Sequence, residues 1–206
     1  MLESTQVGLV AAAEAYLRQE LKTGRLRRQL FPMLTGFGIS DYQDTVRTMG
    51  LNYLTEIGRR VMNLTAISEY PIFPQGKYNA RDYREVSLGS VWLERSTNQP
   101  FLLAEFERFD EAPGQMALLR ERVENLIIGY HQLGGHPAMV LLVFWTYLGT
   151  NTNRVKLLLK FLEQGFSLSN HSLVPGLSEP TRLLIYHCLA TGNSKNLILN
   201  RWIALT

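Results

Sequence analysis

The stretch FLLAEFERFDE, from Phe101 to Glu111, begins as an apolar strand and then places two glutamates, Glu105 and Glu107, one residue apart. Side chains at positions i and i+2 of a β-strand point to the same face and lie about 7 Å apart. Two ionised carboxylates on one face repel each other, and burying them without a partner is costly. The stretch therefore predicts either a solvated face or a positively charged group between the two glutamates.

The composition of the chain bounds its class. Of its 206 residues, 46% are hydrophobic, so the chain can bury a core, and we expect a single domain over residues 1–206. The one cysteine, Cys188, excludes an intrachain disulfide and suits a cytoplasmic protein. The longest apolar run, PAMVLLVFWTYLG, is too short to cross a bilayer as a helix, so we expect no membrane association.

Charge is distributed unevenly along the chain, although the net charge is only +3. Residues 1–60 carry 8 basic and 6 acidic side chains, residues 61–150 carry 7 and 10, and residues 151–206 carry 6 and 2. Either this is ordinary surface variation, or the basic flanks bind a polyanion while the acidic middle holds a cation. The first flank offers candidates for phosphate contact, which could also form a solvated helix face: Arg18, Lys22, Arg25, Arg27 and Arg28.

Periodicity predicts the elements on either side of the opening stretch. Helical spacing predicts one helix over about residues 10–30, bent near Gly24, and a second over about residues 40–64. LTAISEYPIFPQG predicts a short strand, and REVSLGSVWLE and FLLAEFERF predict a hairpin around the turn RSTNQP. A further helix begins at Pro113, and AMVLLVFW predicts a strand covered on both faces.

This order of helices and strands indicates the α/β class, with a mixed sheet flanked by helices. We expect its core over about residues 41–150 and a helical extension over residues 1–40. Residues 151–206 are expected to add two or three helices, over RVKLLLKFLEQGF, EPTRLLIYHCLATG and KNLILNRWIAL.

The hairpin brings several carboxylates near one another. With the turn centred in RSTNQP, Glu105 faces Ser90 across the strands, and Glu107 shares the face of Glu105. Glu69 ends the preceding strand and Glu56 lies on the preceding helix. Oxygen ligands of this kind suit Mg²⁺ or Mn²⁺. A metal held in this way can activate water and neutralise charge on a phosphodiester.

The chain resembles the PD-(D/E)xK restriction-endonuclease-like superfamily over about half its length. The resemblance lies in the helix with EIGRRV, the strand AISEYPI, the hairpin strands SLGSVWL and LLAEFER, and the helix and apolar strand that follow. It implies a restriction-endonuclease-like fold with a Mg²⁺ site that cuts DNA. Glu105 matches the acidic residue of the family's last motif, Glu107 takes the place of its lysine, and Glu56 matches the helix glutamate.

One family position differs in this chain. The second-strand aspartate of the family falls close to Ser90, which cannot replace a charged ligand. Asp82 and Glu85 lie upstream and are the possible substitutes if a bulge or bend brings one of them in.

We expect a metal-dependent nuclease that acts on DNA, with Glu105 and Glu107 in the site and Glu56 or Glu69 assisting. The alternative is a non-catalytic module of the same fold that binds nucleic acid or a protein partner, which could be a second copy of the chain. A third reading is that the acidic pair is simply solvated or salt-bridged to a nearby arginine.

Overall fold

The computed structural model describes residues 2–72, 86–168 and 171–206. The first part contains α1 (Leu2–Thr23), α2 (Arg25–Leu30), the 3₁₀ turn η1 (Pro32–Leu34), α3 (Gln43–Arg60) and β1 (Leu64–Pro71). The second contains β2 (Ser87–Glu94), β3 (Pro100–Arg108), α4 (Pro113–Gln132), β4 (Met139–Tyr147), α5 (Val155–Gln164) and β5 (Phe166–Ser167). The third contains β6 (Leu173–Val174), β7 (Arg182–Asn193) and β8 (Asn196–Ala204).

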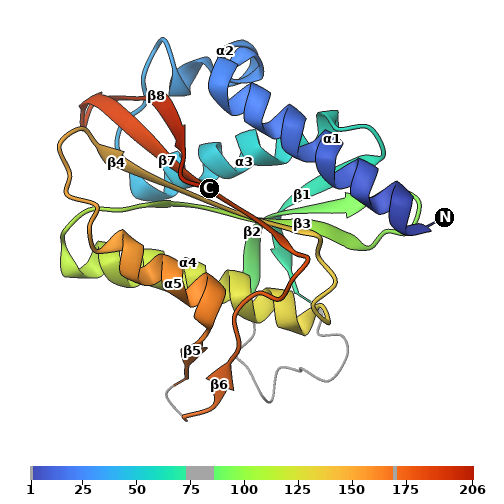
Figure 1. The fold of residues 1–206 in the computed structure, drawn as a ribbon. Helices are drawn as coiled ribbons and strands as arrows, with labels where there is room; N and C mark the ends of the chain where they lie inside the picture. The colour runs from blue at the N-terminus through green and yellow to red at the C-terminus, as the bar shows by residue number, and fades with distance from the viewer. Residues whose placement is uncertain (1, 73–85, 169–170) are drawn as a thin grey trace.

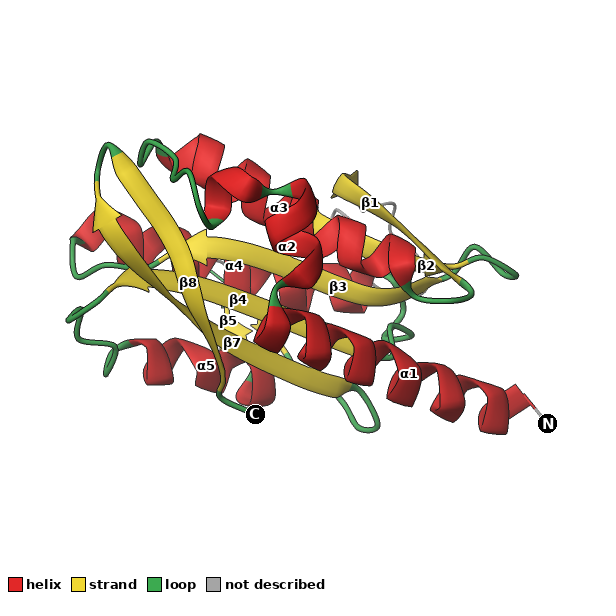
Figure 2. Cartoon of the chain, turned by 90° about the horizontal axis from the view of Figure 1, so that it is seen from above, coloured by secondary structure: helices red, strands yellow, loops and turns green. Residues whose placement is uncertain are grey.

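Six strands form one mixed sheet in the order β1-β2-β3-β4-β7-β8 (Figure 1). β1, β2 and β3 are antiparallel, β3, β4 and β7 are parallel, and β8 returns antiparallel to β7. Helices α1, α2 and α3 lie on the near side of the sheet in Figure 2, and α4 and α5 cover the opposite face. The α/β class and the mixed sheet flanked by helices are therefore confirmed.

The opening stretch forms β3, in the interior of the sheet. Eight of its nine residues are buried. Leu102, Ala104 and Phe106 belong to the apolar cluster under α1 and α3, and Leu103 belongs to the cluster under α4 and α5. The side of β3 that carries Leu102, Ala104 and Phe106 is therefore buried, and the side that carries the two glutamates is buried as well.

The helices predicted at the end of the chain are largely wrong. Only α5 is helical; RLLIYHCLATGN forms β7 and NLILNRWIA forms β8. β7 pairs with β4 over the whole length of β4, and this partner decides between helix and strand for an apolar run that fits both. Gly192, at a φ of 92°, lies at the end of β7, and Asn193 pairs with Asn196 across the tight turn to β8. The polar run TGNSKN between two apolar runs was the hairpin signal in the sequence.

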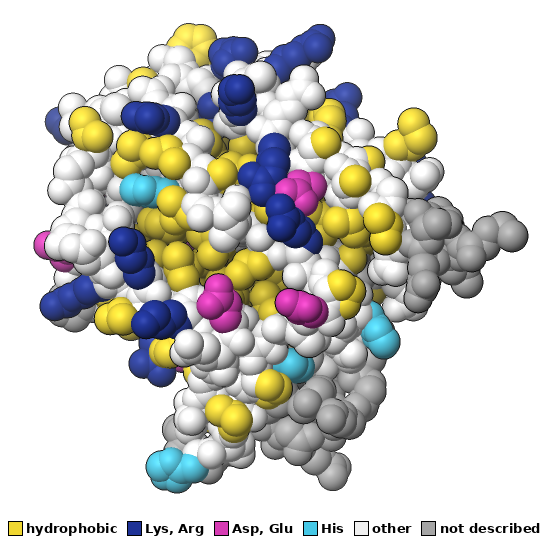
Figure 3. All heavy atoms as spheres, viewed as in Figure 1, with side chains coloured by type: hydrophobic (Ala, Val, Ile, Leu, Met, Phe, Trp, Pro, Cys, Tyr) yellow, Lys and Arg dark blue, Asp and Glu magenta, His cyan; other side chains and the backbone are white. Residues whose placement is uncertain are grey.

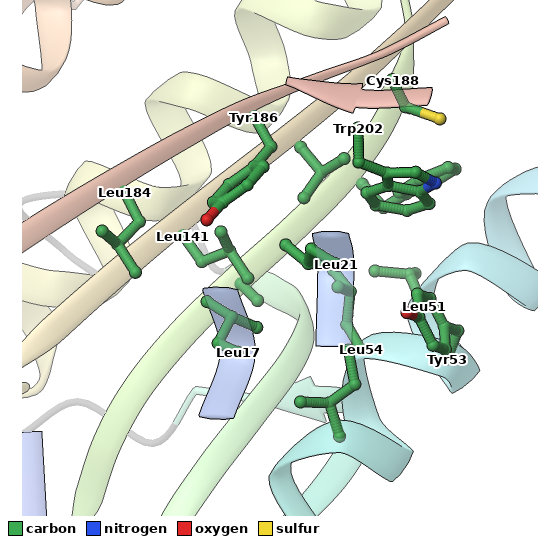
Figure 4. Packing of buried hydrophobic residues seen from close by; sticks show 14 of the residues in the cluster. Leu17, Leu21, Leu51, Tyr53, Leu54, Leu141, Leu184, Tyr186, Cys188 and Trp202 are labelled. Atoms are coloured by element: carbon green, nitrogen blue, oxygen red, sulfur yellow. The ribbon is translucent and has the colours of Figure 1, made fainter. Parts of the chain in front are cut away.

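The amino-terminal helix breaks where predicted. α1 ends at Thr23, and Gly24 takes a left-handed conformation with a φ of 61° before α2 begins. α1 and α3 then bury one face of the sheet. Figure 4 shows the side chains that meet there from α1, α3, β4, β7 and β8: Leu17, Leu21, Leu51, Tyr53, Leu54, Leu141, Leu184, Tyr186, Cys188 and Trp202.

Two glycines let α3 lie close against the sheet. A Cβ atom on Gly50 would stand 2.4 Å from the ring of Phe106, and one on Gly58 would stand 2.6 Å from the ring of Trp92. Both rings are fully buried, so neither can move aside cheaply. The distance between α3 and the sheet therefore depends on the missing side chains.

Gly50→Ala should lower the free energy of unfolding by about 1–3 kcal/mol, because the added methyl group overpacks the core against Phe106. Gly8→Ala in α1 is the matched control, since a Cβ there meets nothing within 4 Å. It should be neutral or stabilising by up to about 1 kcal/mol. Urea denaturation of both variants measures the difference, and equal effects would contradict the close approach of α3.

Candidate functional site

The register of the β2–β3 hairpin differs by one residue from the prediction. Ser90 pairs with Ala104 instead of Glu105, because the turn is centred one residue earlier and a bulge separates Trp92 from Leu93. The hydroxyl of Ser90 lies 2.8 Å from the hydroxyl of Thr55 on α3. Ser90 therefore does not occupy the position opposite Glu105.

Glu105 is fully buried, and each of its two carboxylate oxygens lies near a hydrogen-bond donor. Its Oε1 accepts a hydrogen bond of 2.9 Å from the backbone N–H of Gly89, and its Oε2 lies 3.3 Å from Nη2 of Arg47. Gly89 is the residue on β2 that the register places opposite Glu105. A side chain at this position would approach the carboxylate, since a Cβ there would stand 2.8 Å from Oε2.

Arg47, on α3, is the positive group between the carboxylates. Its Nη1 lies 2.7 Å from Glu69, and its Nη2 lies 3.3 Å from Glu105. Its Nε lies 3.6 Å from Glu107. One guanidinium thus contacts the three carboxylates predicted as metal ligands, and the alternative of a positive partner between Glu105 and Glu107 is confirmed.

Glu107 is also fully buried, and its carboxylate contacts residues of α3, α4 and β3. Its Oε2 lies 3.2 Å from Nε of Arg122 on α4, and its Oε1 accepts a hydrogen bond of 2.8 Å from the backbone N–H of Arg108. The side-chain amide of Gln43, at the start of α3, lies 3.5 Å from the same oxygen. The acidic pair therefore holds α3 and α4 to the end of β3, and is not a solvated face.

Burial changes the acidity of Glu105. Loss of water raises the pKa of its carboxyl to about 7, against the effects of Arg47, Arg122 and the N–H of Gly89, which lower it. The carboxyl of Glu105 consequently changes between its protonated and ionised forms near neutral pH, although its side chain is fully buried.

The remaining predicted site residues lie apart from this cluster or outside the described residues. Glu56 lies on α3 but pairs with Arg60 at 2.8 Å and with Arg59 at 3.8 Å. Asp82 and Glu85 fall outside the described residues. Within the described ranges, no group of three or more His, Cys, Asp or Glu side chains is arranged to hold a metal ion.

The basic residues of the first flank do not form one uniform surface. Lys22, Arg25 and Arg28 are exposed, and Arg18 is half-buried with its Nε 2.7 Å from Glu14. Arg27 differs, because its side chain is only 4% exposed. Its guanidinium stacks over the rings of Trp202 and Tyr53, at 5.0 and 5.7 Å from their centroids. Its predicted contact with phosphate is therefore not compatible with its position.

Sequence reasoning missed the two arginines that complete the cluster. Arg47 follows Val46, a member of the apolar stripe of α3, and Arg122 precedes Val123, which is buried on α4. Both therefore lie at the border of a buried helix face. A buried pair of glutamates requires cations, and arginines at such borders were the signal that the sequence carried.

Comparisons with known proteins identify no relative of this chain. No family model, curated protein or solved structure matches the chain. None of the described helices combines the length and apolar character that a bilayer crossing requires.

Arg47→Ala should destabilise the protein by about 3–5 kcal/mol, because it leaves buried carboxylates without their partner. Arg60→Ala, on the same helix, removes a half-exposed pair with Glu56 and should cost less than about 1 kcal/mol. Urea denaturation at about pH 8 compares them. Adding Glu105→Gln to Arg47→Ala should restore part of the loss; no restoration would contradict the electrostatic account.

The raised pKa of Glu105 predicts a pH dependence of stability. The folded protein keeps the proton up to about pH 7, whereas the unfolded chain releases it near 4.5. The stabilising contribution is thus complete below about pH 4.5 and is lost as pH rises through about 7. Relative to Glu105→Gln, the wild type should lose on the order of 3 kcal/mol across this window. A constant difference between the two proteins from acid to neutral pH would contradict the shift.

Proposed function

We propose that the chain is a restriction-endonuclease-like module that binds nucleic acid without cutting it. The fold supports this through the order of elements between Gln43 and Tyr147: a helix, three antiparallel strands, a second helix and a strand parallel to the third. That is the order on which the PD-(D/E)xK resemblance rests. β7 and β8 extend this unit on the side of β4.

The contact of Arg47 with three carboxylates is the main support for the proposal that the chain does not cut nucleic acid. A metal site for phosphodiester cleavage needs carboxylate oxygens that are free to bind a hard cation. Here Glu69, Glu105 and Glu107 all face the guanidinium, at 2.7 to 3.6 Å. The arrangement of these residues does not fit Mg²⁺ or Mn²⁺ unless Arg47 leaves.

Exposed basic side chains support the proposal that the chain binds nucleic acid. Figure 3 shows Lys and Arg side chains gathered at the top of the view, over α2 and the adjoining end of the sheet. Lys22, Arg25 and Arg28 are exposed at the end of α1 and in α2. Clustered basic side chains of this kind attract the phosphate backbone of nucleic acids.

A Mg²⁺- or Mn²⁺-dependent nuclease acting on DNA is the second candidate. It is favoured by the contact of Glu69, Glu105 and Glu107 with one guanidinium, but a cation could bind there only if Arg47 moved out and the three carboxylates rearranged. For either function we propose a cytoplasmic location, since the one cysteine, Cys188, is free and buried.

Binding of labelled duplex DNA as a function of salt tests the proposal. We expect the variant Lys22→Gln/Arg25→Gln/Arg28→Gln to lower the slope of log K against log salt by up to about three units, about one for each cation that no longer meets a phosphate. The control is Arg154→Gln/Lys156→Gln/Lys160→Gln, which removes the same charge at α5. An equal change in both variants would mean that net charge alone drives binding.

The same samples, incubated with Mg²⁺ or Mn²⁺, separate the two candidates. The wild type should leave the DNA intact. Cleavage by the wild type that is abolished in Glu105→Gln would overturn the non-catalytic proposal and establish the nuclease. Absence of DNA binding even at low salt would overturn both.

A further inference from the structure

Two aromatic side chains are conspicuously exposed in the segment between η1 and α3. Phe37 is 74% exposed and Tyr42 is 72% exposed. Among the described residues they are the two aromatic side chains in the exposed class. Large aromatic rings are usually buried or half-buried. Two exposed rings in one short segment therefore indicate a surface that binds a partner with an apolar face.

The backbone holds this segment firmly in place. The N–H of Phe37 donates to the carbonyl of Pro32 at 3.2 Å, and Ile39 exchanges two hydrogen bonds with Leu197 of β8, at 3.0 and 2.8 Å. The N–H of Asp41 donates to the carbonyl of Ser194 at 2.8 Å. The two rings are therefore displayed on an anchored backbone, which reduces the entropy that a ligand must overcome.

Gly38 explains how the segment reaches the β7–β8 connection. It has a φ of 74°, and a Cβ there would overlap the side chain of Asn196. The glycine thus allows direct contact between the aromatic segment and the hairpin tip. Lys195, at that tip and exposed, stands between Ser194 and Asn196, both of which contact the segment.

A basic side chain therefore lies beside the aromatic segment. Lys195 is exposed, and its neighbours Ser194 and Asn196 contact Asp41 and Gly38 of the segment. Exposed rings with a basic side chain nearby are the combination by which proteins bind single strands. Bases stack on the rings while phosphates meet the cations. In a duplex the faces of the bases are already covered by their neighbours.

We propose that the surface formed by Phe37, Tyr42 and Lys195 binds single-stranded nucleic acid, with bases stacked on the two rings. This inference rests on the proposed function and adds the class of ligand to it. The chemistry of the rings specifies a stacking partner and carries no base preference, because every base has a π-face.

Affinities for a fluorescent single-stranded oligothymidine and for a duplex of the same length test the proposal. Phe37→Ala and Tyr42→Ala should each weaken single-strand binding about 5- to 100-fold and leave duplex binding unchanged. Tyr42→Phe, which keeps the ring, should bind like the wild type. Met62→Ala, at a side chain that is 81% exposed and elsewhere on the chain, is the control for loss of exposed apolar surface.

The outcomes distinguish this inference from the function on which it rests. Neither alanine substitution removes charge, so the salt dependence of binding should stay unchanged while affinity falls. If the wild type binds both DNA forms and the alanine variants bind as the wild type does, the stacking surface is overturned and nucleic-acid binding stands. If the wild type binds neither form, the proposed function fails as well, and the rings belong to a protein interface.

Discussion

The guanidinium of Arg47 is the group on which the centre of this structure depends. β3 is an interior strand, and two of its buried side chains are glutamates. Buried carboxylates are tolerated only when charge and hydrogen bonds replace water. Arg47 supplies charge to both and also to Glu69 at the surface, and Arg122 adds a second positive group at Glu107. The two helices that flank the strand thus contribute one arginine each to the same pair of carboxylates.

This ionic cluster and the close packing of α3 constrain each other. α3 lies near the sheet because Gly50 and Gly58 have no side chains to hold it off. The same position brings Arg47 within reach of β3. If α3 moved outward, the arginine would separate from Glu105 and Glu107, and both carboxylates would be left buried without it. The guanidinium of Arg47 is therefore part of the buried centre of the fold and not a surface addition.

The surface features that point to a ligand lie away from this cluster. They come from the amino-terminal extension and from the β7–β8 hairpin, which meet through the pairing of Ile39 with Leu197. The core contributes a neutralised acidic centre, and the extensions contribute exposed cations and exposed rings. Such a division is consistent with the function proposed above, in which the added elements bind nucleic acid and the central carboxylates serve stability.

The sequence by itself determined the central strand, the order of elements around it and, should Glu105 and Glu107 be buried instead of solvated, the need for a positive partner between them. These follow from alternation, helical spacing and the cost of burying charge, all of which are local or additive. Only the tertiary structure decided which cation answers that need, because Arg47 is 58 residues from Glu105 and meets it through helix packing. It also decided that Ser90 pairs with Ala104, through a bulge that the hydrophobic pattern does not encode. Finally, it made RLLIYHCLATGN a strand, because an apolar run compatible with both helix and strand adopts the form that its partner, β4, can pair with.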